Sequence, residues 1–331
     1  MPRSTSIVTV CMNRREHLLA AAPRVAAWPH HHEHLIVDWS SVEPLRRAAL
    51  PEDSRIRLLR VEGERRWNLC RAYNFAFQQA GGDCLFKLDA DGWPEDLPAA
   101  DALAVDGVVC SFGSGEDGRL GQFLVDRSLL QEVGGFNEHL WGYGFDDKDL
   151  KARLQGHAGA TIRLLPPQAL GVIPHSIEYR ASRAHRADVR PGALEETHSH
   201  ALKRATSMAN RVMAASCPWS QRSPASRYSH DPVADVWRLV PDSLPRPPET
   251  VRQELIRLRR QEFWGRFLML PEVVVMELPV KLLPEERQGD FPVRWWHRLY
   301  WYSLRRVYAA PVAALALLKG RRRQLLRLVR G

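Results

Sequence analysis

The chain has 331 residues, of which 45% are hydrophobic and 26% are charged, and its formal net charge is +9. This composition excludes a disordered or fibrous chain and fits one large globular domain with an appendage. The five cysteines are scattered without a C-x-x-C pair, which argues against a zinc ribbon or a disulfide framework and favours a reducing compartment.

The N-terminal stretch MPRSTSIVTVCM lacks a basic leader, a long apolar region and a small-residue cleavage site, so we expect no signal peptide. The longest apolar run near the end, residues 307–318, contains Pro311 and is shorter than the roughly 20 residues that a spanning helix needs. We therefore expect a cytoplasmic protein.

Short runs of β-type residues recur in the first half of the chain, and their apolar character is continuous rather than alternating. Such runs are typical of strands that are covered on both faces. A helical pattern over residues 67–80, which ends at Gly81 and Gly82, lies between two of them. The alternation predicts an α/β sheet, with ligands bound beyond the carboxyl ends of its strands. The predicted strands cover residues 6–10, 34–37, 55–61, 84–88 and 107–112.

The fourth of these strands ends in the sequence LFKLDADGWP, with Asp89 and Asp91 just before Gly92. Carboxylates are costly to bury without a positive partner. Two carboxylates at this spacing can turn toward one divalent cation, and oxygen ligands suit Mg²⁺ or Mn²⁺. An ordinary acidic loop after a strand is the alternative.

A second acidic group occurs in the sequence GGFNEHLWGYGFDDKDL, residues 134–150. Asp146, Asp147 and Asp149 crowd the expected start of a helix, where capping alone would already favour acidic residues. Crowded carboxylates raise one another's pKa, which suits a general base, and the aromatic side chains of Trp141 and Tyr143 suit the apolar faces of a sugar.

Together with SIVTVCMNRREHL and LIVDWSS, these motifs resemble glycosyltransferases of the GT-A fold, family 2. The acidic stretch is also similar to that of β-1,4-galactosyltransferases and of the galactosyltransferase-like half of chondroitin polymerases. The resemblance covers residues 4–180 and implies a Rossmann-like mixed α/β sheet that binds a nucleotide-sugar, here followed by a C-terminal helical extension.

By this resemblance, Asn13 and Arg14 lie in the first strand-to-helix turn, which meets the nucleotide. Asp38 takes the place of the acid that contacts the uracil or the ribose, and a solvated turn carboxylate is the alternative. Arg71 and Asn74 match donor-side positions on the helix before the D-x-D strand, where the Arg supports the nucleotide end. A surface Arg and a helix-packing Asn are the alternatives.

The resemblance also implies the catalytic and metal-binding residues. Asp147 matches the aspartate that acts as base, and Asp146 replaces a Glu whose role is to bind the acceptor. Asp91 is the expected direct metal ligand, Asp89 binds at the donor and metal site, and His175 closes the metal site. For His175, an ordinary polar surface or core residue is the alternative.

The acceptor would lie against Trp141, Tyr143 and Asp146. Because Asp146 is one methylene shorter than the family's Glu, and because Lys148 stands where the galactosyltransferases often have another acid, the acceptor itself is not implied. The implied reaction is a single displacement with inversion at the anomeric carbon, from a UDP-sugar.

Composition divides the chain into three expected regions. Residues 1–190 form the catalytic domain, residues 191–249 are an irregular linker rich in Pro and Ser, and residues 250–331 form a basic, aromatic helical tail. The last 41 residues contain ten Lys and Arg and no Asp or Glu, so the rest of the chain has a net charge of about −1.

Apolar residues of the tail recur at helical spacing, and arginines lie off that stripe. Helices of this kind lie in a bilayer interface and are attracted to anionic lipid. Packing on the catalytic domain is the alternative, and nucleic-acid binding a further one, although no recognised motif accompanies the charge. The stripe consists of Trp296, Leu299, Tyr300, Leu304, Val307 and Tyr308.

We therefore expect a metal-dependent, inverting glycosyltransferase that acts on a saccharide or lipid-linked saccharide acceptor. The setting would be surface polysaccharide or lipopolysaccharide synthesis, with the protein peripheral on the inner face of the cell membrane. A non-catalytic module that binds a nucleotide-sugar or a glycan is the alternative from another class.

Overall fold

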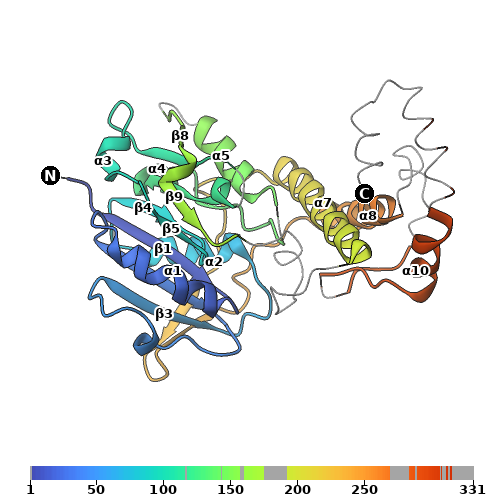
Figure 1. Cartoon of the computed structure of the whole chain (residues 1–331), viewed down its shortest axis with the longest axis horizontal. Helices are drawn as coiled ribbons and strands as arrows, with labels where there is room; N and C mark the ends of the chain where they lie inside the picture. Colours follow the sequence, from blue (N-terminus) through green and yellow to red (C-terminus); the bar gives the residue numbers. More distant parts are fainter. Residues whose placement is uncertain are drawn as a thin grey trace. The chain divides into compact units, whose positions relative to one another are not determined.

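The computed structural model describes residues 2–115, 118–142, 144–156, 160–174, 192–268, 283–287 and 289–305, and the single positions 307, 311 and 314. The chain divides into two compact units. Unit 1 comprises residues 1–175 and 210–248, and unit 2 comprises residues 176–209 and 249–331. Both are visible in Figure 1.

The centre of unit 1 is a mixed sheet with the strand order β10-β11-β3-β2-β1-β4-β7-β6-β8. The neighbouring strands from β11 to β4 are parallel to one another, whereas β7 is antiparallel to both β4 and β6. A second, two-stranded sheet pairs β5 with β9. The strands are β1 (Thr5–Cys11), β2 (Glu33–Trp39), β3 (Ile56–Glu62), β4 (Cys84–Lys87), β5 (Gly92–Pro94), β6 (Cys110–Gly113), β7 (Phe123–Asp126), β8 (Arg163–Leu165), β9 (Leu170–Val172), β10 (Tyr228–Asp231) and β11 (Val236–Leu239).

All five strands predicted from the sequence are present, with shifts of up to three residues at their ends. Every residue of β1 and β4 is buried, as expected for strands covered on both faces. The prediction of an α/β fold with a large, mostly parallel sheet is therefore confirmed.

Helices cover both faces of this sheet. Val25 and Trp28, at the end of α1, pack with Ile7 and Phe86 on one face. On the other face, Phe77 of α2 lies 6.1 Å, ring to ring, from Phe123 of β7. The helices of unit 1 are α1 (Arg15–Ala27), α2 (Leu69–Gln79), α3 (Ala100–Leu103), α4 (Arg127–Glu132) and α5 (Asp146–Gly156), with 3₁₀ turns η1 (Arg47–Ala49), η2 (Arg119–Gly121) and η3 (Pro167–Ala169).

The segment 191–249 differs from the expected irregular linker. It contains the helix α7 (Ala193–Ser216) and the hairpin β10–β11, which extends the central sheet beyond β3. Its aromatic side chains explain this, because the rings of Tyr228 and Trp237 lie 5.1 and 5.3 Å from that of Phe75 on α2. Pro and Ser content predicted the turns but not the packing of these rings against the sheet.

Unit 2 contains residues 193–209 of α7 together with α8 (Glu249–Phe267) and α10 (Trp295–Tyr302). Phe263, Trp264 and Phe291 form the centre of its core. Arg259, which is buried, donates to both carboxylate oxygens of Glu286 at 2.9 and 3.0 Å. This ion pair holds residues 283–287 on α8.

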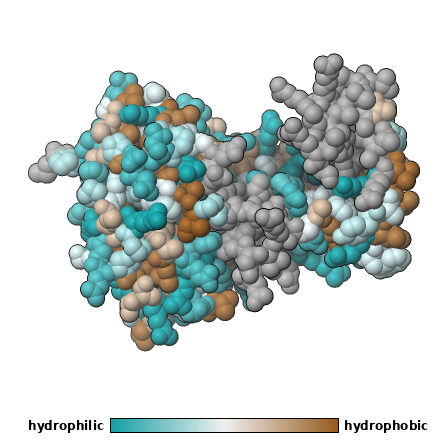
Figure 2. All heavy atoms as spheres, viewed as in Figure 1, coloured by the Kyte–Doolittle hydropathy of each residue, from teal (hydrophilic) through white to brown (hydrophobic). Residues whose placement is uncertain are grey.

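The first part of the basic tail contributes Phe291 and Trp301 to this core. Phe291, His297 and Trp301 are buried, whereas Trp296, Leu299, Leu304 and Val307 of the predicted stripe are exposed. Apolar residues accordingly gather on the surface near α10 (Figure 2). Tyr308 lies outside the described residues. Among the residues that are described, every helix is too short or too polar to cross a bilayer.

Two consecutive glycines join α4 to the segment that precedes the acidic motif. Gly135 has φ +66°, and a Cβ there would lie 2.4 Å from Oδ1 of Asn74. That oxygen accepts a hydrogen bond from the N–H of Phe136 at 2.8 Å, and Nδ2 of Asn74 donates to its carbonyl at 2.9 Å. Glycine is therefore required for the amide of Asn74 to bind this backbone.

We predict that Gly135→Ala lowers the stability of unit 1 by about 2–4 kcal/mol, because it adds a steric clash to an unfavourable backbone angle. Gly107→Ala is the matched control, since Gly107 has φ +81° and no heavy atom within 4 Å of its Cβ position. It should cost only about 1 kcal/mol. Thermal unfolding midpoints of the two variants test this, and equal shifts would exclude the steric role of Asn74.

Candidate active site

A buried lysine lies where the D-x-D strand ends. Lys87, the last residue of β4, is 1% exposed, and its Nζ donates to Oδ1 of Asp89 at 2.9 Å and to the carbonyl of Gly121 at 2.6 Å. The Tyr73 hydroxyl donates to the same carboxylate oxygen at 3.1 Å, and Nε2 of Gln122 donates to the other at 3.0 Å. Both oxygens of Asp89 are thus hydrogen-bonded within the protein.

The start of α5 brings two further carboxylates to this lysine. Asp146 is buried and accepts a hydrogen bond from the N–H of Gly144 at 3.1 Å. Asp147 is half-buried, and its Oδ1 is a buried atom that has no hydrogen-bond partner among the residues that the structure describes. Its Oδ2 lies 3.0 Å from the position that a Cβ on Gly121 would take, so the absence of a side chain at Gly121 leaves room for it.

The electrostatics of this acidic cluster, defined as Asp89, Asp146 and Asp147, depend on Lys87. Burial and the neighbouring Asp146 raise the pKa of Asp147 to about 7, against the opposing effect of Lys87. Burial also raises the pKa of Asp146. Although burial alone would lower the pKa of Lys87, Asp89 and Asp147 outweigh it and raise that pKa. Lys87 is therefore a cation, and Asp147 exchanges a proton near neutral pH.

The loop before α5 is held by a residue far away in the sequence. Asn210 of α7 accepts from the N–H of Trp141 at 3.3 Å and donates to the carbonyls of Trp141 and Gly144 at 3.0 and 2.7 Å. Trp141 is half-buried, whereas Tyr143 lies outside the described residues. Asn210 thus holds the backbone at Trp141 and at Gly144, two residues before Asp146.

Two predicted donor residues lie together where β1 and β2 end. Asn13, at φ +57°, accepts at its Oδ1 a hydrogen bond from the N–H of Val42 at 2.8 Å. Asp38 is buried, and it accepts from the N–H groups of Ser41 and Leu45 and from Arg60 at 2.6 Å. Asp38 therefore shapes the loop after β2 rather than facing solvent. Arg14 is the N-cap residue of α1 and is half-buried.

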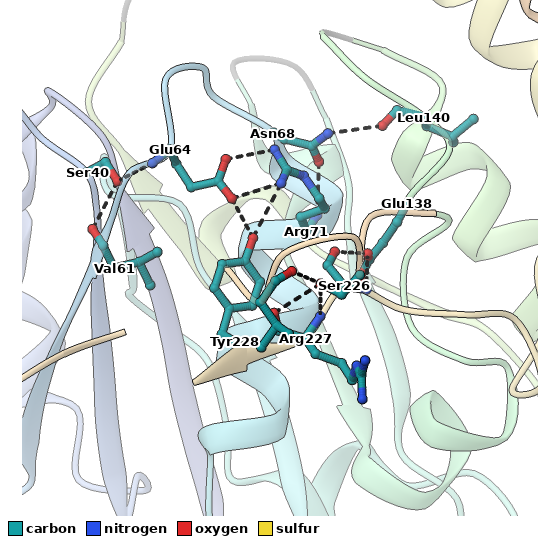
Figure 3. Close-up of polar contacts among 12 residues, drawn as sticks. Ser40, Val61, Glu64, Asn68, Arg71, Glu138, Leu140, Ser226, Arg227 and Tyr228 are labelled. Carbon is teal, nitrogen blue, oxygen red and sulfur yellow. Dashed lines mark hydrogen bonds and ion pairs between the residues drawn. The ribbon is translucent and has the colours of Figure 1, made fainter. Parts of the chain in front are cut away.

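The other two predicted donor residues, Arg71 and Asn74, lie on α2. Arg71 forms a bidentate ion pair with Glu64, with both distances 2.8 Å, and the hydroxyl of Tyr228 donates to the same Glu64 at 2.6 Å (Figure 3). Asn74 is buried against residues 136–138, as described above. Asn74 therefore has the packing role that was its alternative, and Arg71 is neutralised by Glu64. Their donor roles stay predictions.

The predicted metal ligands are only partly within the described residues. Where the chain is described, no group of three His, Cys, Asp or Glu side chains is placed to hold a metal. His175 lies outside the described residues, yet the strand leading to it is adjacent to Asp91, whose carbonyl accepts from the N–H of Ile173 at 2.8 Å. The donor set of Asp91 and His175 fits a divalent cation that a diphosphate also binds. Asp89 fits less well because its oxygens are occupied.

Several site residues were not predicted from the sequence. Lys87 had a signal, since a lysine in the middle of an apolar strand needs a buried acidic partner. Gln122, Asn210 and Glu64 had none, because their importance depends on contacts between segments that are distant in the sequence.

Part of the chain resembles known proteins. Residues 6–164 match the family model of glycosyl transferase family 2. No curated protein matches the chain. This match agrees with the resemblance seen in the sequence, and the mixed, mostly parallel sheet agrees with the expected α/β fold.

Solved structures with a similar fold include other glycosyltransferases. The catalytic domain of Drosophila β1,4-galactosyltransferase 7, in complex with xylobiose, is 15% identical, covering 71% of this chain and 92% of that one, with a TM-score of 0.42. The mannosyltransferase PcManGT of Pyrobaculum calidifontis, in complex with GDP-Man and Mn²⁺, is 13% identical, covering 99% and 85%, with a TM-score of 0.48. Glucosyl-3-phosphoglycerate synthase of Mycobacterium tuberculosis, with Mn²⁺, UDP and glucosyl-3-phosphoglycerate, is 15% identical, covering 69% and 85%, with a TM-score of 0.45.

The position of Lys87 predicts a pH dependence. If Asp147 is the base that the resemblance implies, it must be ionised to act, so kcat/KM should rise with pH and level off above the pKa of Asp147, about 7. Lys87→Met removes the cation that favours the ionised carboxylate, so the midpoint should move to higher pH. Lys148→Met removes an exposed cation of the same helical turn and should not move it. An unchanged midpoint in Lys87→Met would contradict the electrostatic role of Lys87.

Proposed function

We propose that the protein is an inverting glycosyltransferase that moves a sugar from a UDP-sugar to a saccharide acceptor. The observation that carries this proposal is Asp147, whose buried Oδ1 lacks a partner in the described part of the chain and whose pKa is raised to about 7. A general base works best when its pKa lies near the working pH. The match of residues 6–164 to the glycosyl transferase family 2 model supports the reaction class.

In this reaction Asp147 accepts the proton of an acceptor hydroxyl. The hydroxyl oxygen forms the new bond to the anomeric carbon on the face opposite the nucleotide, while the bond from that carbon to the diphosphate oxygen breaks. The sugar is thereby transferred with inverted configuration and the UDP leaves. Trp141 and Tyr143 are proposed to bind the acceptor sugar through their rings, and Asp146 through hydrogen bonds.

The donor is proposed to lie across the carboxyl ends of β1, β2 and β4, which is where ligands bind in sheets of this kind. Asn13 and Asp38 shape the two loops at the nucleotide end. Arg71 and Asn74 support the same end from α2, and Lys87 holds Asp89 in a fixed orientation toward the donor.

A divalent cation, Mn²⁺ or Mg²⁺, would be held by Asp91 and His175. When bound, it supplies positive charge that stabilises the departing diphosphate. The pairing of Ile173 with Asp91 supports this assignment, because it brings the chain two residues before His175 to the D-x-D loop.

Replacement of the proposed base tests the function. Asp147→Asn should keep UDP binding and lose transfer by a factor on the order of 10² to 10⁴, the usual contribution of a positioned base. Asp149→Asn is the control, because Asp149 lies in the same turn but is bound by Arg153 at 2.8 Å. It should affect stability rather than transfer. Near-wild-type transfer by Asp147→Asn would move the base role to another acid.

Calorimetry of UDP binding tests the metal ligands separately from activity. Asp91→Ala and His175→Ala should each lose the increase in UDP affinity that Mn²⁺ gives. Asp89→Asn should keep that increase, because Asp89 is bound by Lys87, Tyr73 and Gln122. Metal dependence that survives in the first two variants would remove this site from the account.

The setting we propose is the assembly of surface polysaccharide or lipopolysaccharide at the inner face of the cell membrane. Support comes from the tail, since residues 306–331 contain seven Lys and Arg and no acid. Such a segment is attracted to anionic lipid by about 1 kcal/mol for each engaged basic residue.

A shortened chain tests the membrane role of the tail. The cut belongs after Arg305, since a cut before Phe291 would remove Phe291 and Trp301 from the core of unit 2. The chain that ends at Arg305 should bind phosphatidylglycerol liposomes about 10²-fold more weakly and keep its UDP affinity. Raised salt should release the full-length protein. Equal sedimentation of both chains would exclude this role.

A further inference from the structure

Unit 2 has a cavity of its own, and none of its lining residues belongs to the proposed active site. It has a volume of about 390 Å³, within the usual range of small-ligand sites. Its lining residues come from α8, from residues 283–287 and from residues 292–296. The lining residues are Arg260, Leu283, Pro284, Glu285, Arg287, Pro292, Arg294 and Trp296.

The charge of this cavity is positive. Arg260 is largely buried and pairs with Glu285 at 2.7 Å. Neither Arg287 nor Arg294 has an acidic partner among the residues that the structure describes. Three arginines and one glutamate therefore line the cavity, and the glutamate side chain is itself 81% exposed. Arginine clusters of this kind bind phosphate groups, because the planar guanidinium can donate two parallel hydrogen bonds.

The helix α10 adds to this preference. It begins directly after Arg294, so the N–H groups and the positive end of the helix dipole lie at the cavity. The N-terminus of a helix would by itself be weak evidence for phosphate binding. Here it coincides with Arg287 and Arg294, which lack an acidic partner within the described ranges.

Beside the cavity, α10 exposes an apolar surface. Trp295, Leu299 and Tyr302 are spaced along one face of the helix and are 75%, 59% and 59% exposed. Trp296, at the cavity itself, is 41% exposed. A ligand whose phosphate enters the cavity would thus have apolar side chains next to it. Aromatic residues of this kind favour the boundary between lipid headgroups and acyl chains.

We propose that this cavity binds the phosphate of an anionic lipid, whose acyl chains lie against the exposed face of α10. The site is independent of the proposed transfer reaction, because none of its residues belongs to unit 1. It also differs from the basic segment 306–331, which would attract any anionic surface. The cavity recognises one phosphate at a fixed place.

The test uses the full-length protein and dihexanoyl phosphatidylglycerol below its micelle concentration, with binding measured by calorimetry at about 0.15 M salt. We expect saturable binding of the lipid, and binding of inorganic phosphate that is at least tenfold weaker. Arg287→Gln with Arg294→Gln should weaken lipid binding tenfold or more. Leu299→Ser should weaken lipid binding and leave phosphate binding unchanged.

The matched control is Arg252→Gln with Arg257→Gln. These two exposed arginines of α8 pair with Glu249 and Glu254, and their loss changes the net charge equally. This variant should change lipid binding less than twofold. Equal weakening by both arginine pairs, no saturable binding, or phosphate that binds as tightly as the lipid would each overturn the proposal. UDP affinity, which should be unchanged in all variants, distinguishes this failure from a failure of the proposed transferase.

Discussion

The ammonium group of Lys87 is the interaction on which the rest of the site depends. It is buried at the end of a central strand, where an unpaired charge would cost several kcal/mol, and it is stabilised by Asp89 and the acids at the start of α5. The same contact holds the D-x-D loop against η2 through the carbonyl of Gly121. Because Lys87 opposes the rise in the pKa of Asp147, that pKa stays near neutrality rather than higher. One buried cation thus orders the loop and adjusts the proposed base.

The loops around this centre are fixed by the returning segment of unit 1. Asn210 binds the backbone on both sides of residue 143, and the N–H of Ser226 donates to Glu138 at 2.8 Å, which in turn accepts from Asn74. The hydroxyl of Tyr228 donates to Glu64, which pairs with Arg71. The segment that follows residues 6–164 therefore supports the loops of the candidate site.

Sequence reasoning predicted what depends on local pattern. The apolar runs predicted β1 to β4, the helical spacing after Trp67 predicted α2, and the crowded acids indicated the start of α5. The motifs also indicated the family. The sequence did not predict features that depend on contacts between distant segments. Asn210 looks like any polar residue of a long helix. The hairpin β10–β11 was interpreted as linker from its local composition, and only the contacts of Tyr228 and Trp237 with Phe75 show that it packs on the domain. Asp38 lies near the end of β2 and Asn74 within α2, and their hydrogen bonds to backbone could not be foreseen.

The central claim is that the acidic cluster performs a single displacement on a UDP-sugar. The most direct test uses an α-linked UDP-sugar with water as the acceptor. Proton NMR then identifies the anomer of the sugar that is released first, before mutarotation. The account predicts that the β anomer appears first in the presence of Mn²⁺, and that Asp147→Asn abolishes this release. The α anomer as the first product would contradict the displacement by a base at Asp147.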